Sequence, residues 1–149
     1  MTTVSEILGI NYIVIAPTLA LLLTVIVLLF CTITISTPMY VKKYVSFAGI
    51  LLTLFTIFLK FGLFLTDGVS SYFSEKILLD EFALVGNVII GMVLLFTFNS
   101  FWKTSEMIEN KTTEALILVL MSASGFLLMV DAENFIMLFI GLEIGSISL

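Results

Sequence analysis

The stretch IVIAPTLALLLTVIVLLFCTITI, residues 13–35, contains 23 residues and no charged side chain. As an α-helix it would be about 34 Å long, enough to cross the ~30 Å hydrocarbon core of a bilayer with some tilt. We expect Pro17 in the first turn of this helix, where its missing N–H is tolerated. The stretch therefore predicts a membrane-spanning helix.

The composition of the whole chain supports the same environment. Hydrophobic residues make up 60% of the 149 residues and charged residues 11%, whereas soluble domains have about 45–50% and about 25%. A soluble fold would have too few polar side chains to cover its surface. The chain is therefore predicted to be surrounded by lipid.

Four further apolar runs follow the first. Only helices and closed barrels satisfy their backbone groups in lipid, and these runs are too long and continuous for barrel strands. We predict an all-α membrane protein with a single embedded region over residues 1–149 and about five transmembrane helices. The expected spans are residues 13–35, 45–65, 82–101, 114–130 and 135–149, with a four-residue hairpin at 131–134.

Lysine positions predict the orientation, because cytoplasmic loops are enriched in basic residues. With the N-terminus outside, the two inner loops hold four of the six lysines, namely Lys42, Lys43, Lys103 and Lys111. The outer loops hold Lys76. Tyr44 and Trp102 would then lie near the inner interface. The N-terminus carries Glu6 and no basic residue, so a retained first span is expected rather than a cleaved signal peptide.

The fifth span contains 15 residues, about 22 Å of helix, which is shorter than the hydrocarbon core. A carboxylate at Leu149 would end inside hydrocarbon at a large energetic cost. We therefore expect the chain to be the N-terminal piece of a longer membrane protein, truncated within the fifth helix.

Most acidic residues have simple structural interpretations. Glu114 follows two threonines and would complement the dipole in the first turn of the fourth helix, although a functional role stays open. Asp131 and Glu133 are expected to cap the fifth helix, and Asp80 and Glu81 the third.

Lys60 lies five residues before the end of the second span. Its stem could snorkel to the interface, which is the simpler interpretation. The alternative is a role in a polar path through the membrane.

Glu143 is the strongest functional candidate, since it would lie near the bilayer midplane. A carboxylate there takes a proton or needs a basic partner, and intramembrane ionisable residues usually mark ion or proton paths. The structural alternative is a permanently protonated Glu hydrogen-bonded to a neighbouring helix.

Small residues surround Glu143 at helical spacing. Gly141 and Gly145 form a GxxxG pair that shares a helix face with Ser148 and permits close packing. Glu143 lies about 200° around the helix from Gly141, so it faces another way. Its own stripe contains the hydroxyl of Ser146, together with Phe139, Ile140 and Ile147.

Three stretches resemble one known family, the antiporter-like membrane subunits of respiratory complex I, most of all the subunit N type. LFIGLEIGSISL (138–149) is similar to the family's fifth-helix segment with its GLE motif. ILLDEFALVGNVIIGMVLL (77–95) is similar to the family's entry to the third helix, where Asp80 matches the acid. TTEALILVLMSASGFLLMVDAENFIMLFIGLE (112–143) is similar throughout its course.

The resemblance implies a subunit of a proton-translocating NADH–quinone oxidoreductase in the bacterial inner (plasma) membrane. In that family the Glu at the position of Glu143 pairs with a lysine on the seventh helix, and the present chain has no counterpart of that lysine. Lys60 does not match it. Other membrane-arm subunits and the lipid bilayer would be partners. The redox groups (NADH, flavin, iron–sulfur clusters and quinone) would belong to partner subunits, with no cofactor and no catalytic residue in this chain.

Two alternatives remain open. The chain could belong to a multisubunit cation/proton antiporter or a membrane-bound hydrogenase, which use the same superfamily, or it could be a structural assembly subunit. No metal site is expected, because the chain has no His and its one cysteine, Cys31, cannot form a cluster alone. The chain has no Arg and no run of basic residues, so it lacks the positive patch that nucleic-acid binding requires.

Overall fold

The computed structural model describes residues 4–34, 38–72, 77–104 and 109–148. These residues form five helices and one small antiparallel hairpin. The elements are α1 (Val4–Thr34), α2 (Met39–Asp67), β1 (Ser70–Tyr72), β2 (Ile77–Leu79), α3 (Glu81–Thr104), α4 (Glu109–Val130) and α5 (Phe135–Ile147).

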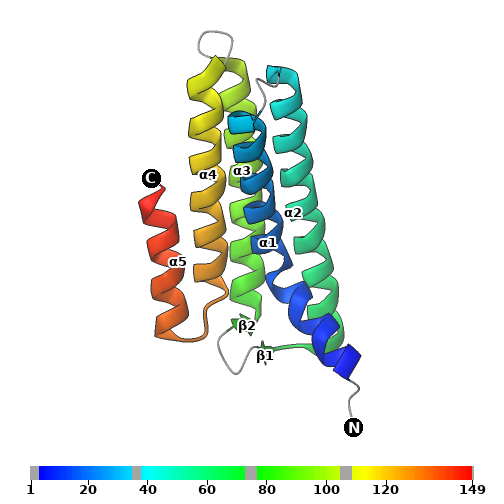
Figure 1. Ribbon diagram of the computed structural model, residues 1–149. Coiled ribbons are helices and arrows are strands. Elements are labelled where there is room, and N and C mark those ends of the chain that lie inside the picture. Colours follow the sequence, from blue (N-terminus) through cyan, green and yellow to red (C-terminus); the bar gives the residue numbers. More distant parts are fainter. Residues whose placement is uncertain (1–3, 35–37, 73–76, 105–108, 149) are drawn as a thin grey trace.

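Four of the helices close into a ring (Figure 1). α1 packs against α2, α2 against α3, α3 against α4 and α4 against α1, while the shorter α5 packs along α4. The N-terminus, the hairpin and the α4–α5 turn lie at one end of the bundle, which we call the hairpin end.

The core lies at the centre of the ring. All four long helices contribute buried aliphatic or aromatic side chains, such as Leu21, Ile50, Phe98 and Leu120. The outward faces are equally apolar, and Phe58, for example, is 69% exposed. A helix that is apolar all round belongs in lipid, because no polar face is available for water.

Four helices are long and apolar enough to cross a membrane, over Tyr12–Ile33, Tyr40–Thr66, Glu81–Phe101 and Thr112–Val130. The shorter Phe135–Ile147 is a further apolar helix. The prediction of an all-α membrane protein with about five helices is confirmed.

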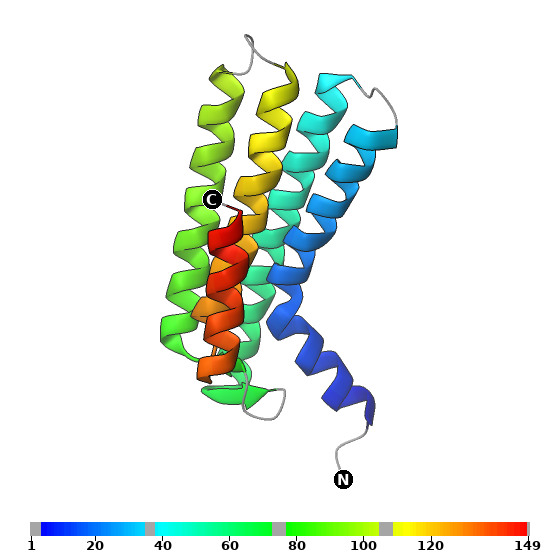
Figure 2. The ribbon, with the colours of Figure 1, turned by 60° about the vertical axis from the view of Figure 1, so that its left-hand side comes forward.

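The expectation for Pro17 is wrong. α1 begins at Val4, so Pro17 lies well inside the helix rather than in its first turn. An internal proline removes one backbone hydrogen bond and its ring clashes with the preceding turn. Figure 2 shows the N-terminal part of α1 inclined away from the other helices, which is the bend that such a residue causes.

The hairpin was not expected from the sequence. β1 and β2 pair from Ser70–Leu79 to Tyr72–Ile77. The chain enters the hairpin through Gly68, whose φ of 69° favours glycine and whose N–H donates to Phe64 O at 2.9 Å. The described parts of the polar connection after α2, residues 68–72 and 77–80, thus carry a small two-stranded sheet at this end of the bundle.

The helix boundaries correct one further expectation and confirm another. Asp80 Oδ1 accepts a hydrogen bond from Ala83 N at 2.7 Å, so it caps α3 as predicted. Glu114 is the sixth residue of α4 and lies beyond the first turn, so its expected capping role is wrong. Tyr44 is exposed on α2, whereas the Trp102 ring and the side chains of Lys76, Lys103 and Lys111 lie outside the described part of the chain.

Candidate functional site

The contact between α4 and α5 is built on glycines. Gly125 of α4 faces Gly141 and Gly145 of α5 so closely that a Cβ at Gly125 would lie 2.7 Å from Gly141 O and 2.8 Å from Gly145 Cα. A Cβ at Gly141 would meet the backbone of Met129 in the same way. Gly141 and Gly145, the predicted packing residues, lie on the face of α5 that meets α4, and Gly125 is the residue of α4 opposite them.

Serines complete this contact. Ser122 Oγ of α4 donates to Gly145 O across the interface at 3.1 Å, and Ser148 Oγ donates to Ile144 O at 2.8 Å. Both hydroxyls are buried and satisfied by backbone carbonyls. The glycine face therefore fixes the rotation of α5 about its own axis.

Glu143 points away from the glycine face and is exposed. It is the ninth residue of α5, about 12 Å along the helix axis from Phe135. In the described part of the chain no hydrogen bond or ion pair involves its carboxylate. Ser146 is exposed beside it, and its hydroxyl donates to the backbone carbonyl of Glu143 at 3.2 Å, not to the carboxylate.

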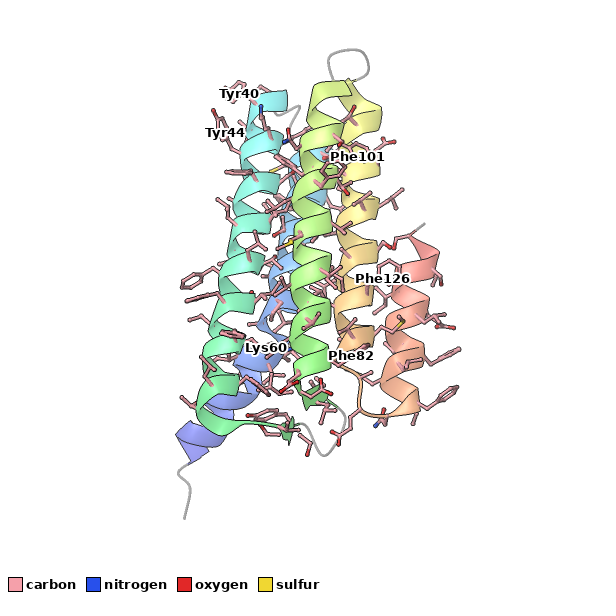
Figure 3. The ribbon with its side chains drawn as sticks, turned by 180° about the vertical axis from the view of Figure 1, so that it is seen from behind. Tyr40, Tyr44, Lys60, Phe82, Phe101 and Phe126 are labelled. Carbon is pink, nitrogen blue, oxygen red and sulfur yellow. The ribbon has the colours of Figure 1, made fainter. Side chains whose placement is uncertain are left out.

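The second ionisable group lies inside the bundle. Lys60 of α2 is 0% exposed, and its Nζ lies 2.6 Å from Asp131 Oδ1 at the end of α4. Figure 3 shows Lys60 toward the hairpin end of α2. The expectation that Lys60 snorkels to the interface is wrong, because a carboxylate within the protein takes the place of water as its partner.

Asp131 also departs from its expected role. Its side chain is buried with Lys60 and does not cap α5; the cap is Asn134, whose Oδ1 accepts from Met137 N at 2.9 Å. Glu133 is exposed in the same turn. The residues next to Asp131 favour a role as the cap of α5. They contain no information about Lys60, which is distant in the sequence and becomes a partner only in the folded bundle.

Asn87 of α3 joins the pair. Its Nδ2 donates to Asp131 Oδ1 at 2.9 Å, and Asn87 is 0% exposed. The hairpin closes over this cluster, because Leu78 N donates to Asp131 O at 2.9 Å and Ile77 bridges to Ala132. Lys60, Asn87 and Asp131 thus form a buried polar cluster contributed by α2, α3 and the turn that follows α4.

The polar cluster is incompletely hydrogen-bonded. Lys60 Nζ and Asp131 Oδ1 form an ion pair, but within the described residues Lys60 Nζ has no further partner and Asn87 Oδ1 has none. Burial raises the pKa of the Asp131 carboxyl from its ordinary value, against the opposing effects of Lys60 and Asn87. Both observations mark the cluster as costly to maintain in a dry interior.

The sequence contained one signal for the pair. Lys60 and Asp131 lie near the same end of two spans that run in the same direction, so both lie toward the hairpin end. Other carboxylates lie at that end too, and only the fold, in which α2 and α4 face each other across the ring, brings these two side chains together.

A comparison with known proteins adds to this geometry. The chain is similar to an oxidoreductase subunit. Over 94 residues, 62% of the chain, it is 33% identical to NADH-quinone oxidoreductase subunit N of Campylobacter concisus. The chain spans 19% of the length of that relative. No protein-family model matches the chain.

The similarity and the fold agree at a coarse level. The relative is a named subunit of an oxidoreductase complex, and the present chain has four helices of membrane-spanning length and a fifth apolar helix. These findings indicate a multi-pass membrane protein related to that subunit. Within the described residues no group of three or more His, Cys, Asp or Glu side chains could hold a metal ion.

Proposed function

We propose that this chain is part of an antiporter-like membrane-arm subunit of NADH–quinone oxidoreductase. In this proposal it takes part in moving protons across a bacterial inner membrane while NADH reduces quinone. The observation that carries the proposal is the 33% identity to subunit N. The placement of Glu143 on the outward face of α5 supports it.

The physical role of Glu143 follows from its surroundings. A carboxylate at mid-membrane depth favours its neutral, protonated form, whereas a nearby cation favours the ionised form. Moving a cation toward Glu143 therefore releases a proton, and moving it away takes a proton up. The glycine contact with α4 holds the carboxylate pointing outward, where another part of the assembly can bring that cation.

This chain's own residues supply only proton handling in the proposal. The redox reaction, with NADH, flavin, iron–sulfur clusters and quinone, belongs to partner subunits. Lys60, Glu114 and Ser146 remain secondary candidates: Lys60 is buried in an ion pair, while Glu114 and Ser146 are exposed on α4 and α5.

Glu143→Gln in the complete protein within its assembled complex tests the proposal. The change keeps the shape and a hydrogen-bonding head but removes the titrating charge. We expect NADH-driven proton uptake into vesicles, followed with a pH-sensitive dye, to fall relative to NADH oxidation. Glu133→Gln, the same change at an exposed turn position, is the matched control and should leave proton uptake unchanged.

Two results would contradict the proposal. Normal proton uptake by Glu143→Gln at normal assembly would remove Glu143 from the proton path. Isolation of the complete protein with hydrogenase or cation/proton antiporter subunits instead of NADH-oxidising subunits would assign it to one of the alternative complexes.

A further inference from the structure

The buried polar cluster of Lys60, Asn87 and Asp131 lies apart from the outward face that carries Glu143. Its members come from α2, α3 and the end of α4, and each is at most 2% exposed. The other two side chains converge on Asp131 Oδ1, which lies 2.6 Å from Lys60 Nζ and 2.9 Å from Asn87 Nδ2. Two opposite charges are therefore enclosed within a bundle whose remaining interior is mostly apolar.

Stability alone gives little reason for this pair. Removing two charges from water can cost more than their attraction returns, and well-packed apolar side chains of similar size often serve a fold equally well. Ionisable residues within membrane spans are rare, and they usually mark proton or ion paths rather than serving a purely structural role. The pair therefore needs an account besides packing.

The unsatisfied atoms of the cluster point to proton exchange. An ammonium group carries three N–H donors, and Asp131 is the one partner of Lys60 Nζ within the described residues. Asn87 Oδ1 is an unused acceptor in the same cluster. These groups offer a donor and an acceptor to a water molecule, the carrier through which buried groups exchange protons.

The cluster also has a carboxylate on its aqueous side. Asp80, in the connection between β2 and α3, is partly exposed and caps α3 through Ala83 N. Asp80 thus places a partly exposed carboxylate at the hairpin end of the bundle, the end at which Lys60 and Asp131 are enclosed.

We propose that Lys60 and Asp131 form a second proton-exchange site, which opens to the aqueous phase at the hairpin end of the bundle. This inference rests on the proposed function. A proton leaves Lys60 Nζ and binds Asp131 Oδ1, which converts the ion pair into a neutral amine and a carboxylic acid. Asp131 then releases that proton toward Asp80, and the amine is reprotonated from within the assembly, so that one proton passes for each cycle.

Asp131 can transmit this change to α5. Its backbone carbonyl holds Leu78 of the hairpin, and Asn134, three residues later, caps the helix that carries Glu143. A change in charge at Asp131 would therefore occur three residues before the cap of α5.

Two variants in the complete protein and its complex test the inference. Lys60→Met with Asp131→Leu removes both charges together, so no unpaired charge is buried. Lys60→Arg keeps the positive charge and the pairing, but a guanidinium group does not release its proton. Lys42→Met is the matched control, because it makes the same lysine-to-methionine change as Lys60→Met but at the opposite end of α2.

We expect both variants to assemble and to oxidise NADH while proton uptake per NADH falls, and we expect Lys42→Met to retain wild-type uptake. Wild-type uptake in either variant would overturn the inference. If the double variant fails to assemble, Lys60→Arg decides; if neither assembles, the pair is structural and the inference is overturned. Glu143→Gln, measured in parallel, separates the proposed function from the inference about Lys60 and Asp131. If Glu143→Gln loses proton uptake while the Lys60 and Asp131 variants keep it, the proposed function stands and the inference fails.

Discussion

At the scale of single residues, Asp131 binds two neighbours at once, one through its side chain and one through its backbone. Its carboxylate pairs with Lys60, and its backbone carbonyl accepts from Leu78 of the hairpin. The residue therefore connects α2, the hairpin and the turn before α5. A single side chain at the end of a helix has a larger structural role here than its loop position suggests.

Breaking the ion pair should be more harmful than removing it. Lys60→Met alone leaves the Asp131 carboxylate buried without its cation, and this should destabilise the protein by about 3–5 kcal/mol. Adding Asp131→Leu should recover most of that loss, because no charge then remains in the interior. Thermal unfolding of the two single variants and the double variant in detergent measures this coupling; equal destabilisation in all three would contradict it.

Asn134 should control the first turn of α5. Asn134→Ala removes the acceptor for Met137 N and should cost about 1 kcal/mol. Hydrogen exchange at the Met137 amide should accelerate. Glu133→Ala, at the adjacent exposed position, is the control, and an equal acceleration there would show that Asn134 is not the cap.

At the scale of elements, α4 and α5 pack backbone against backbone. Three glycines and the Ser122 hydroxyl allow it. Because lipid offers no hydrophobic drive for helix association, such contacts depend on close packing and on hydrogen bonds across the interface.

Gly125→Ala should therefore separate α4 from α5. Its Cβ would meet backbone atoms of Gly141 and Gly145, which cannot rotate aside as a side chain would. We expect a loss of about 1–3 kcal/mol, the usual range for overpacking. Gly62→Ala is the matched control, since nothing lies within 4 Å of a Cβ there, and unfolding in detergent should show no loss for it. Equal stability of the two variants would contradict the packing argument.

The helices could be predicted well and the hairpin could not. Long charge-free runs identify spans because lipid imposes one length and one polarity. Three-residue strands carry no such constraint, and β1–β2 depends on the Asp131 carbonyl as much as on its own residues. The GxxxG spacing identified one side of the α4–α5 contact, but the facing Gly125 could be found only once the helices were placed.

At the scale of the whole molecule, the ring order of the helices decides the second ionisable site. Glu143 could be predicted because its depth follows from its own helix. The Lys60–Asp131 pair depends on which helices face each other across the ring, and hydropathy contains no information about how helices are arranged. The two sites thus differ in how much of the fold is needed to find them.

The predicted orientation can be tested on the complete protein. In a Cys31→Ser background, Glu133→Cys and Tyr40→Cys place single exposed thiols at opposite ends of the bundle. A membrane-impermeant maleimide added to intact cells should label Glu133→Cys, at the hairpin end with the N-terminus, and not Tyr40→Cys. The reverse pattern would place the N-terminus inside, contrary to the lysine distribution.

The separation of Lys60 and Asp131 along the chain has a consequence for biosynthesis. α2 leaves the ribosome well before the end of α4, so Lys60 enters the membrane without its partner. Until Asp131 arrives, the ammonium group must reach the headgroups along its own stem or remain beside the insertion machinery. Completion of α4 is therefore the step at which the second helix can settle at its final depth, and premature termination before Asp131 should leave α2 as a substrate for membrane quality control.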